Sequence, residues 1–500
     1  MKQATLILDA DFVISEVDPR LFGGFAEHLG RHIYSGMYEP DHPTADAEGF
    51  RQDVLELVRE MRMPVVRYPG GNFVSGYRWE DGVGPKGDRP ARLDLAWGGL
   101  EPNTFGTNEF MDWCRKAGTA PMLAVNLGTR GPEAAQALVE YCNHPGGTQW
   151  SDLRRSHGYA EPHGVKVWCL GNEMDGPWQM CQKTAWEYGR IATEAAKLMK
   201  WTDPTIETVL CGSSGRTMRT FGRWEWEALH EAYDQTDYLS LHTYYGNVND
   251  DTATFLAQPD FMSDFILETV SMCDAVGATK KIRRKINLSF DEWNVWNQTP
   301  DQVHTGEKWT VRRPQLEQQY TMEDALVVGG MLITLLTHAD RVKIGCIAQI
   351  VNAIAPIMTE PGGRAWKQGT YYPFVAASQL GRGTVLHTLL RAPVYATKTR
   401  EEVPIVKAAS VVKDDSLTIF ALNREPSGES VTLNGSLRRF ARAHGVKHTV
   451  LSHADLKAVN TADLPGTIAP RGADQLPTWD ADTFTAVLPP YSWNVIQFSL

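Results

Sequence analysis

Residues 165–200, VKVWCLGNEMDGPWQMCQKTAWEYGRIATEAAKLMK, contain one complete unit of a pattern that recurs along the chain. The apolar run Val165–Leu170 is typical of a buried strand, and residues 184–200 repeat apolar side chains with helical spacing. The turn between them is polar and carries a carboxylate. A buried strand followed by a helix is the unit that builds a parallel sheet covered by helices.

Between about residues 20 and 380 the same unit can be counted eight times. The strand-like runs are Phe22–Glu27, Pro64–Tyr68, Pro121–Asn126, Val165–Leu170, Thr208–Gly212, Tyr238–His242, Ile286–Phe290 and Lys343–Gln349. Helical patterns lie between them, at 51–61, 107–118, 133–142, 184–200, 224–234, 261–277 and 321–339. Eight strands with intervening helices predict an α/β fold, a closed (β/α)₈ TIM barrel rather than an open doubly wound sheet.

After about residue 380 the pattern changes to short alternating runs separated by turn residues, as in VPIVKAASVVKDDSLTIFALNREPSGESVTLNG at 403–435. This composition predicts an all-β sandwich, jelly-roll-like, at the C-terminus. The N-terminal stretch Ala4–Val17 also alternates, and we expect it to pair with that sandwich, because an independent two-stranded hairpin is marginal in water. The predicted domains are 18–383 for the barrel and 1–17 plus 384–500 for the sandwich.

The net charge of the chain argues against nucleic acid as a binding partner. The 500-residue chain carries 49 basic and 60 acidic residues, a net charge of −11, whereas a nucleic-acid binder usually has the opposite sign. No stretch approaches the ~20 apolar residues of a membrane span, and the N-terminus lacks the apolar run of a signal peptide. Seven scattered cysteines without a CxxC pair predict reduced, buried thiols. We expect a cytoplasmic enzyme without nucleic acid or membrane as partner; secretion by an uncleaved or lost signal is the alternative.

Polar residues follow the apolar runs, where a barrel places its active site. They are carboxylates, amides and aromatic residues, a set that suits a sugar: Glu27, Arg67, Asn72, Asn172, Glu173, His242, Tyr244, Asp291, Glu292, Trp293, Trp296 and Gln349. Carboxyl groups serve as acid, base and nucleophile, amides bind hydroxyl groups, and tryptophans cover ring faces.

Glu173 and Glu292 follow strands four and seven, and we expect them to face each other across the barrel mouth. Glycoside hydrolysis needs one protonated and one ionised carboxyl group, and a shared pocket separates their pKa values. The period-two phase of SFDEW leaves Asp291 as an alternative nucleophile, because it shares a side with Asn287 and Ser289. If those two face the interior, a bulge or the strand end must re-aim Glu292.

Five sequence blocks resemble the glycoside hydrolases of family 51, the intracellular α-L-arabinofuranosidases. The blocks are FGGFAEHLGR (22–31), RYPGGNF (67–73), LGNEMDGPW (170–178), HTYY (242–245) and SFDEWNVW (289–296). The resemblance implies a barrel with a β-sandwich that includes the N-terminal strand, and retaining removal of terminal arabinofuranosyl units. It also implies a hexamer.

The resemblance also implies roles for the matching residues. Glu173 matches the general acid/base and Glu292 the nucleophile, with carboxyl groups ~5–5.5 Å apart in a retaining enzyme. The remaining matches bind substrate or orient the nucleophile: Glu27, Arg67, Asn72, Trp97, Asn172, His242, Tyr244, Trp296 and Gln349.

The resulting hypothesis is a retaining exo-α-L-arabinofuranosidase that acts on arabinose-containing oligosaccharides from arabinan and arabinoxylan, with neither cofactor nor metal. A related retaining glycosidase for another sugar, an endo-glucanase or a xylosidase, keeps both glutamates and is the main alternative. A catalytically silent carbohydrate-binding barrel and an oxidoreductase are weaker alternatives.

Overall fold

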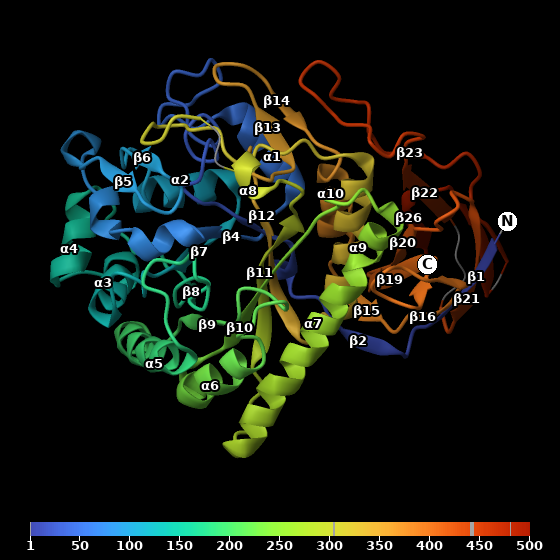
Figure 1. The fold of residues 1–500 in the computed structure, drawn as a ribbon, viewed down its shortest axis with the longest axis horizontal. Coiled ribbons are helices and arrows are strands. Elements are labelled where there is room, and N and C mark those ends of the chain that lie inside the picture. Colours follow the sequence, from blue (N-terminus) through green and yellow to red (C-terminus); the bar gives the residue numbers. More distant parts are fainter. Residues whose placement is uncertain (1, 304–305, 441–444, 481) are drawn as a thin grey trace.

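The computed structural model describes residues 2–303, 306–440, 445–480 and 482–500 (Figure 1). Its centre is a closed barrel of eight strands, each paired in parallel with its two neighbours. In barrel order the strands are β3 (Gly23–Phe25), β4 (Val65–Tyr68), β7 (Ala120–Ala124), β8 (Val167–Cys169), β9 (Glu207–Cys211), β10 (Tyr238–Tyr245), β11 (Asn287–Val295) and β12 (Val342–Ala348). Each overlaps one predicted run, so the predicted (β/α)₈ barrel is confirmed.

Helices surround the barrel (Figure 1). They are α1 (Gln52–Met61), α2 (Thr107–Ala117), α3 (Pro132–Asn143), α4 (Gln149–Ser156), α5 (Ala185–Thr202), α6 (Arg223–Ala232), α7 (Thr252–Thr279), α8 (Pro300–Val303), α9 (Met322–Thr337) and α10 (Tyr371–Leu380). Among the described residues no helix is both long and apolar enough to cross a membrane. All seven cysteines are unpaired, and all except Cys181 are buried, as predicted.

Helix α7 starts earlier than the sequence pattern predicts. The predicted start at residue 261 follows Pro259, whereas the helix begins at Thr252 and includes that proline. Asp251 caps the true start, because its side chain accepts a hydrogen bond from the Thr254 amide. Pro259 is buried and packs where Gly330 of α9 leaves room. Tertiary packing therefore keeps the proline inside the helix.

The C-terminal part and the N-terminal stretch form two packed sheets that share an apolar core; their strands pair antiparallel except for β1 and β21. The five-stranded sheet has the order β16 (Leu389–Arg391), β1 (Lys2–Asp9), β21 (Val431–Arg438), β25 (Thr483–Leu488) and β24 (Thr478–Asp480). The seven-stranded sheet has the order β2 (Val13–Glu16), β15 (Thr384–Leu386), β19 (Val406–Lys413), β20 (Ser416–Asn423), β26 (Ser492–Ser499), β22 (Gly445–Leu451) and β23 (Arg471–Gly472). The predicted sandwich is confirmed.

The N-terminal stretch contributes one strand to each sheet. Strand β1 pairs in parallel with β21, from Lys2 opposite Val431, while β2 pairs antiparallel with β15. In Figure 1 the N- and C-terminal labels accordingly lie at the same end of the molecule. The expected pairing with the C-terminal sheet is therefore confirmed. We propose 18–383 and 1–17 plus 384–500 as the limits of the two domains.

Removal of β1 should destabilise the protein without touching the barrel mouth. Leu6 is fully buried in the sandwich core, so Leu6→Ala should lower the free energy of unfolding by ~2–5 kcal/mol. Deletion of residues 1–17 should lower the melting temperature further, and Gln3→Ala on the exposed face of the strand is the control. A truncated protein that melts at the unchanged temperature would contradict the structural role of β1.

Helix α9 lies between the barrel and the sandwich and contacts β19 and β20. Two adjacent glycines make this contact possible. A Cβ atom at Gly329 would lie 2.6 Å from Trp493 Cε3 of the sandwich, so only glycine allows the indole to approach. The glycines that interrupt this apolar helix in the sequence thus serve the contact between domains.

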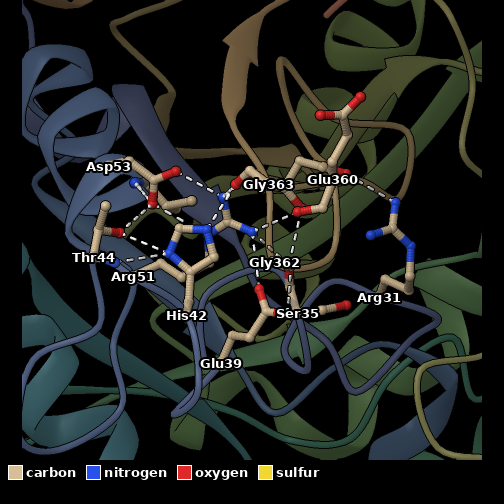
Figure 2. Close-up of polar contacts among 12 residues, drawn as sticks. Arg31, Ser35, Glu39, His42, Thr44, Arg51, Asp53, Glu360, Gly362 and Gly363 are labelled. Carbon is tan, nitrogen blue, oxygen red and sulfur yellow. Dashed lines mark hydrogen bonds and ion pairs between the residues drawn. The ribbon is translucent and has the colours of Figure 1, made fainter.

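The described residues also form three short hairpins: β5 (Arg92–Asp94) with β6 (Gly99–Glu101), β13 (Ile357–Thr359) with β14 (Ala365–Lys367), and β17 (Val394–Tyr395) with β18 (Val403–Pro404). Arg51 fixes the loop after β3 to the β13–β14 hairpin (Figure 2). Its fully buried guanidinium donates to the carboxylates of Glu39 at 3.0 Å and Asp53 at 2.7 Å and to the carbonyl oxygens of Glu360 and Gly363. Partners on both segments satisfy this buried cation and hold one rim of the barrel mouth in place.

Candidate active site

A β-bulge in β11 determines where its carboxylates point. Ser289 pairs with Ser240 of β10, but the next pair joins Glu292 to His242, so β11 has one more residue than β10 in this interval. A bulge of this kind re-aims the side chains that follow it. As a result Asp291 and Glu292 both reach polar partners inside the barrel, although they are adjacent in a strand.

The Glu292 carboxylate is held by two donors, one from the adjacent strand β10 and one from β4, which is not adjacent to β11 in the barrel. Oε1 accepts a hydrogen bond from Arg67 Nη1 at 2.6 Å, and Oε2 accepts one from the Tyr244 hydroxyl at 2.8 Å. Arg67 is itself fixed because its Nη2 donates to Asn172 Oδ1 at 2.6 Å. Charge-assisted bonds of this length fix the orientation of a carboxylate firmly.

Glu173 lies in the turn after β8 and has a left-handed backbone, with φ of +44°. Its carboxylate accepts hydrogen bonds from His242 Nδ1 at 2.9 Å and from Trp178 Nε1 at 2.7 Å. Burial raises the pKa of Glu173, and the nearby charge of Glu292 raises it further, while His242 opposes the rise. A carboxyl group with a raised pKa is suited to donate a proton near neutral pH.

His242 lies among three carboxylates. Its Nδ1 is 2.9 Å from Glu173 Oε1 and 3.5 Å from Glu292 Oε2, and its Nε2 is 3.1 Å from Asp291 Oδ1. Burial lowers the pKa of His242, but the carboxylates outweigh that effect and raise it to about 10. Glu173, His242 and Glu292 offer three potential metal ligands. An imidazolium that donates from both nitrogens has no lone pair for a metal ion.

Glu27 is the centre of a second set of contacts. Its Oε1 accepts from the Phe73 amide at 3.0 Å and from Trp97 Nε1 at 2.9 Å, and its Oε2 accepts from Gln349 Nε2 at 3.0 Å. Burial raises the pKa of Glu27 to about 8. The three side chains thus form a connected polar wall with an aromatic face.

Most of the predicted residues line one cavity of about 1010 Å³: Glu27, Asn72, Trp97, Glu173, His242, Tyr244, Glu292, Trp296 and Gln349. Arg67 and Asn172 are not among the lining residues but contact two of them: Arg67 binds Glu292, and Asn172 Nδ2 lies 3.5 Å from Asn72 Oδ1. One oxygen or nitrogen atom each of Glu173, His242 and Glu292 lies within 4.8 Å of the others. Two carboxylates therefore share a single pocket.

Comparison with known proteins identifies the family. Two family models match, the α-L-arabinofuranosidase 1 domain at residues 57–257 and the α-L-arabinofuranosidase C-terminal domain at residues 291–492. The intracellular exo-α-(1→5)-L-arabinofuranosidase of Halalkalibacterium halodurans is 53% identical over 99% of this chain and 98% of that protein. A like-named protein of Bacillus subtilis is 51% identical over 99% of both chains. A family 51 α-L-arabinofuranosidase structure from Bifidobacterium longum has 42% identity and a TM-score of 0.95 over 100% of both chains.

The chain belongs to glycoside hydrolase family 51. The resemblance drawn from its five sequence blocks is confirmed by the full-length similarity.

In this family 51 chain, Asp291 lies below the cavity and does not line it. Its side chain is only 1% exposed and accepts from Ser240 Oγ at 2.6 Å and from His242. Although burial opposes it, Arg67 and His242 hold the pKa of Asp291 below its usual value. Arg67 and His242 therefore favour the ionised form of Asp291 below the cavity, whereas Glu292 lines the cavity itself.

Trp178 is a site residue that was missed by looking for polar side chains directly after each predicted strand, a procedure called the strand-end rule below. It lies in the loop after β8, is 51% exposed, and lines the cavity while its indole N–H binds Glu173. The signal in the sequence is its place at the end of LGNEMDGPW, the block that carries Glu173. An exposed tryptophan with its polar atom on a carboxylate orients that carboxylate and offers an apolar face to a ligand.

The charge of His242 should control the alkaline limb of the pH profile. Its hydrogen bond and positive charge lower the pKa of Glu173, so His242→Asn should let that pKa rise. A proton donor with a higher pKa stays protonated to higher pH, and the alkaline limb of kcat/KM should therefore move to higher pH while the rate falls. His230→Asn on the outer helix α6 is the control. An alkaline limb that stays in place or moves to lower pH would contradict this coupling.

Proposed function

We propose that the chain is a retaining exo-α-L-arabinofuranosidase that removes terminal, non-reducing α-L-arabinofuranosyl units from oligosaccharides of arabinan and arabinoxylan. The observation that carries the proposal is the closeness of Glu173 and Glu292, whose nearest ligand atoms are within 4.8 Å in one pocket. A retaining glycosidase has its carboxyl groups ~5–5.5 Å apart, whereas an inverting enzyme needs room for a water molecule between them.

In the first step Glu292 attacks the anomeric carbon while Glu173 donates its proton to the leaving oxygen. The C–O bond to the acceptor sugar breaks, and the arabinofuranosyl unit becomes an ester of Glu292. In the second step Glu173, now ionised, takes a proton from water as that water attacks the same carbon. Two inversions give arabinose with retained configuration. The raised pKa of Glu173 favours the first role, and its carboxylate form performs the second.

The neighbouring residues position these two groups. Arg67 and Tyr244 hold the Glu292 carboxylate by hydrogen bonds, and Arg67 also holds the Asn172 amide. Asn172 is proposed to bind the sugar hydroxyl beside the reacting carbon. Further sugar contacts come from lining residues that can bind hydroxyl groups or cover a ring face: Glu27, Asn72, Trp97, His242, Trp296 and Gln349.

We also propose the cellular setting and the assembly. The relatives named intracellular support a cytoplasmic enzyme of arabinan degradation whose partners are arabinose-containing oligosaccharides, and the net charge of −11 argues against nucleic acid as a partner. We propose a homo-oligomer on the family resemblance alone, which suggests a hexamer. Light scattering should then give six times the 55.8 kDa chain mass.

The test is the release of free arabinose from α-(1→5)-linked arabinotriose with a labelled reducing end. An exo-acting enzyme should leave labelled arabinobiose as the first large product, and proton NMR should show the α-anomer of arabinose first. Formation of the β-anomer first would overturn the retaining assignment. A panel of aryl glycosides separates the alternatives, since a xylosidase or an endo-glucanase would prefer xylosides or cello-oligosaccharides.

A further inference from the structure

The cavity extends well beyond the residues that hold the reacting sugar. Its outer part is lined by the loop after β9, by α7 and by the loop between β17 and β18 of the sandwich. The lining residues there are Trp178, Arg216, Met218, Tyr245, Gln258, Phe261 and Thr399. Pockets of ~300–1000 Å³ hold ligands of drug size, so about 1010 Å³ has room for several sugar units rather than one.

The polar wall around Glu27 indicates in which direction the acceptor chain of a longer substrate extends from the reacting sugar. Glu27, Trp97 and Gln349 are joined by hydrogen bonds and close the side of the pocket where the terminal sugar is proposed to bind. The rest of the chain must then leave past Glu173, which protonates its oxygen, and past Trp178. This direction leads into the outer part of the cavity.

Phe261 is the aromatic side chain that α7 contributes there. Two guanidinium groups lie against its ring, Arg216 at 6.0 Å from the centroid and Arg400 at 5.6 Å. Arg216 comes from the loop after β9 and Arg400 from the β17–β18 loop, so three separate elements meet at this ring. Cation–π contacts of this kind fix the ring at the cavity wall.

The charges around Phe261 cancel. Arg216 donates to the two oxygens of Glu268 at 2.8 and 2.6 Å, and Arg400 donates to Asp264 at 2.8 Å. Two cations are therefore matched by two carboxylates on the same helix. A neutral cluster gives no reason to recruit a uronic acid or a phosphorylated sugar, whereas an aromatic ring and the nearby Gln258 amide suit the C–H and hydroxyl groups of a neutral sugar.

We infer that the cluster of Phe261, Arg216 and Arg400 forms an acceptor-chain site that binds the second and later units of a neutral pentose oligosaccharide. The inference rests on the proposed arabinofuranosidase activity and adds a preference for chain length to it. Phe261 acts on specificity and takes no part in bond cleavage. The sandwich domain contributes to the site through Thr399, which lines the cavity, and through Arg400, whose guanidinium lies 5.6 Å from the centroid of the Phe261 ring.

The experiment measures kcat/KM of wild type and variants on 4-nitrophenyl α-L-arabinofuranoside and on α-(1→5)-linked arabinobiose, arabinotriose and arabinotetraose. Phe261→Ala should reduce kcat/KM about tenfold on the triose and tetraose, the loss expected when an aromatic contact disappears. The nitrophenyl substrate has no second sugar, so its kcat/KM should stay within about twofold. Phe261→Leu keeps apolar volume without the ring and should show the same selectivity.

Leu267→Ala is the matched control, because this exposed residue lies on the same helix and does not line the cavity. The inference is overturned if Phe261→Ala and Phe261→Leu lower kcat/KM by the same factor on all substrates. It is equally overturned if neither variant lowers kcat/KM on the tetraose. It is also overturned if wild type cleaves arabinobiose and arabinotetraose equally well, a result independent of any variant's folding. Failure of wild type to hydrolyse any arabinofuranoside would instead remove the proposed function.

Discussion

Glu292→Gln should lower kcat/KM by at least ~10⁴-fold on every arabinofuranoside, whatever its leaving group. The amide keeps the size of the carboxylate and its place beside Arg67 and Tyr244, so the loss reports the missing nucleophile and not a collapsed site. No glycosyl-enzyme should form. The measurement is mass spectrometry of acid-quenched enzyme, which in wild type should find the sugar on the peptide that contains Glu292.

Asp291→Asn is the matched control for this prediction. Asp291 is adjacent in sequence but lies below the cavity, where it anchors His242 and Arg67. Its loss should slow the reaction by misplacing those two groups, yet the glycosyl-enzyme should still form on Glu292. A covalent intermediate on Asp291, or one that survives in Glu292→Gln, would make Asp291 the nucleophile.

Glu173→Ala should lower the rate of hydrolysis by a factor that depends on the leaving group of the substrate. Natural sugars leave as poor alkoxides, so their hydrolysis should fall by ~10²–10⁴-fold without the acid. A dinitrophenolate needs little protonation, and with this substrate the glycosyl-enzyme should still form. The second step then lacks its base and limits turnover. Azide needs no base, so it should accelerate turnover and give the arabinosyl azide with retained configuration.

Glu27→Gln provides the control for the acid/base assignment. Glu27 is a third buried carboxyl group of the same cavity, beside Glu173 and Glu292, and accepts hydrogen bonds from Trp97 and Gln349. Its replacement should lower kcat/KM by a similar factor on activated and natural substrates, and azide should not accelerate turnover. If Glu173→Ala behaved in that way instead, the assignment of Glu173 as acid/base would be falsified and Glu27 or Asp291 would be reconsidered.

The barrel could be predicted because strands buried on both faces give nearly continuous apolar runs. The run Ile286–Phe290 shows the limit of this reading, since β11 continues through the polar residues to Val295. Local alternation puts Asp291 and Glu292 on opposite sides, but the bulge turns both inward. The bulge depends on pairing with β10 and β12, which a single segment does not encode.

The strand-end rule brought most of the catalytic pocket together, because the ends of parallel strands converge in a barrel. It could not find side chains from outside the strand ends. Trp178 comes from a loop, Phe261 from a helix whose start lies before a proline, and Arg400 from a hairpin of the other domain. Their meeting depends on how the sandwich packs on the barrel, and α9 sets that contact through Gly329.

The parallel pairing of β1 with β21 also constrains how the protein is made. Lys2 leaves the ribosome well before its neighbour Val431, which follows it by 429 residues in the chain. At ~5–20 residues per second, the first strand waits roughly 20–90 s for its partner. Throughout that interval the apolar side chains Leu6 and Leu8 have no sheet to cover them, while the barrel sequence is already emerging. The nascent chain therefore exposes the apolar face of β1 until β21 has been synthesised, and chaperones that bind apolar segments during translation should bind there.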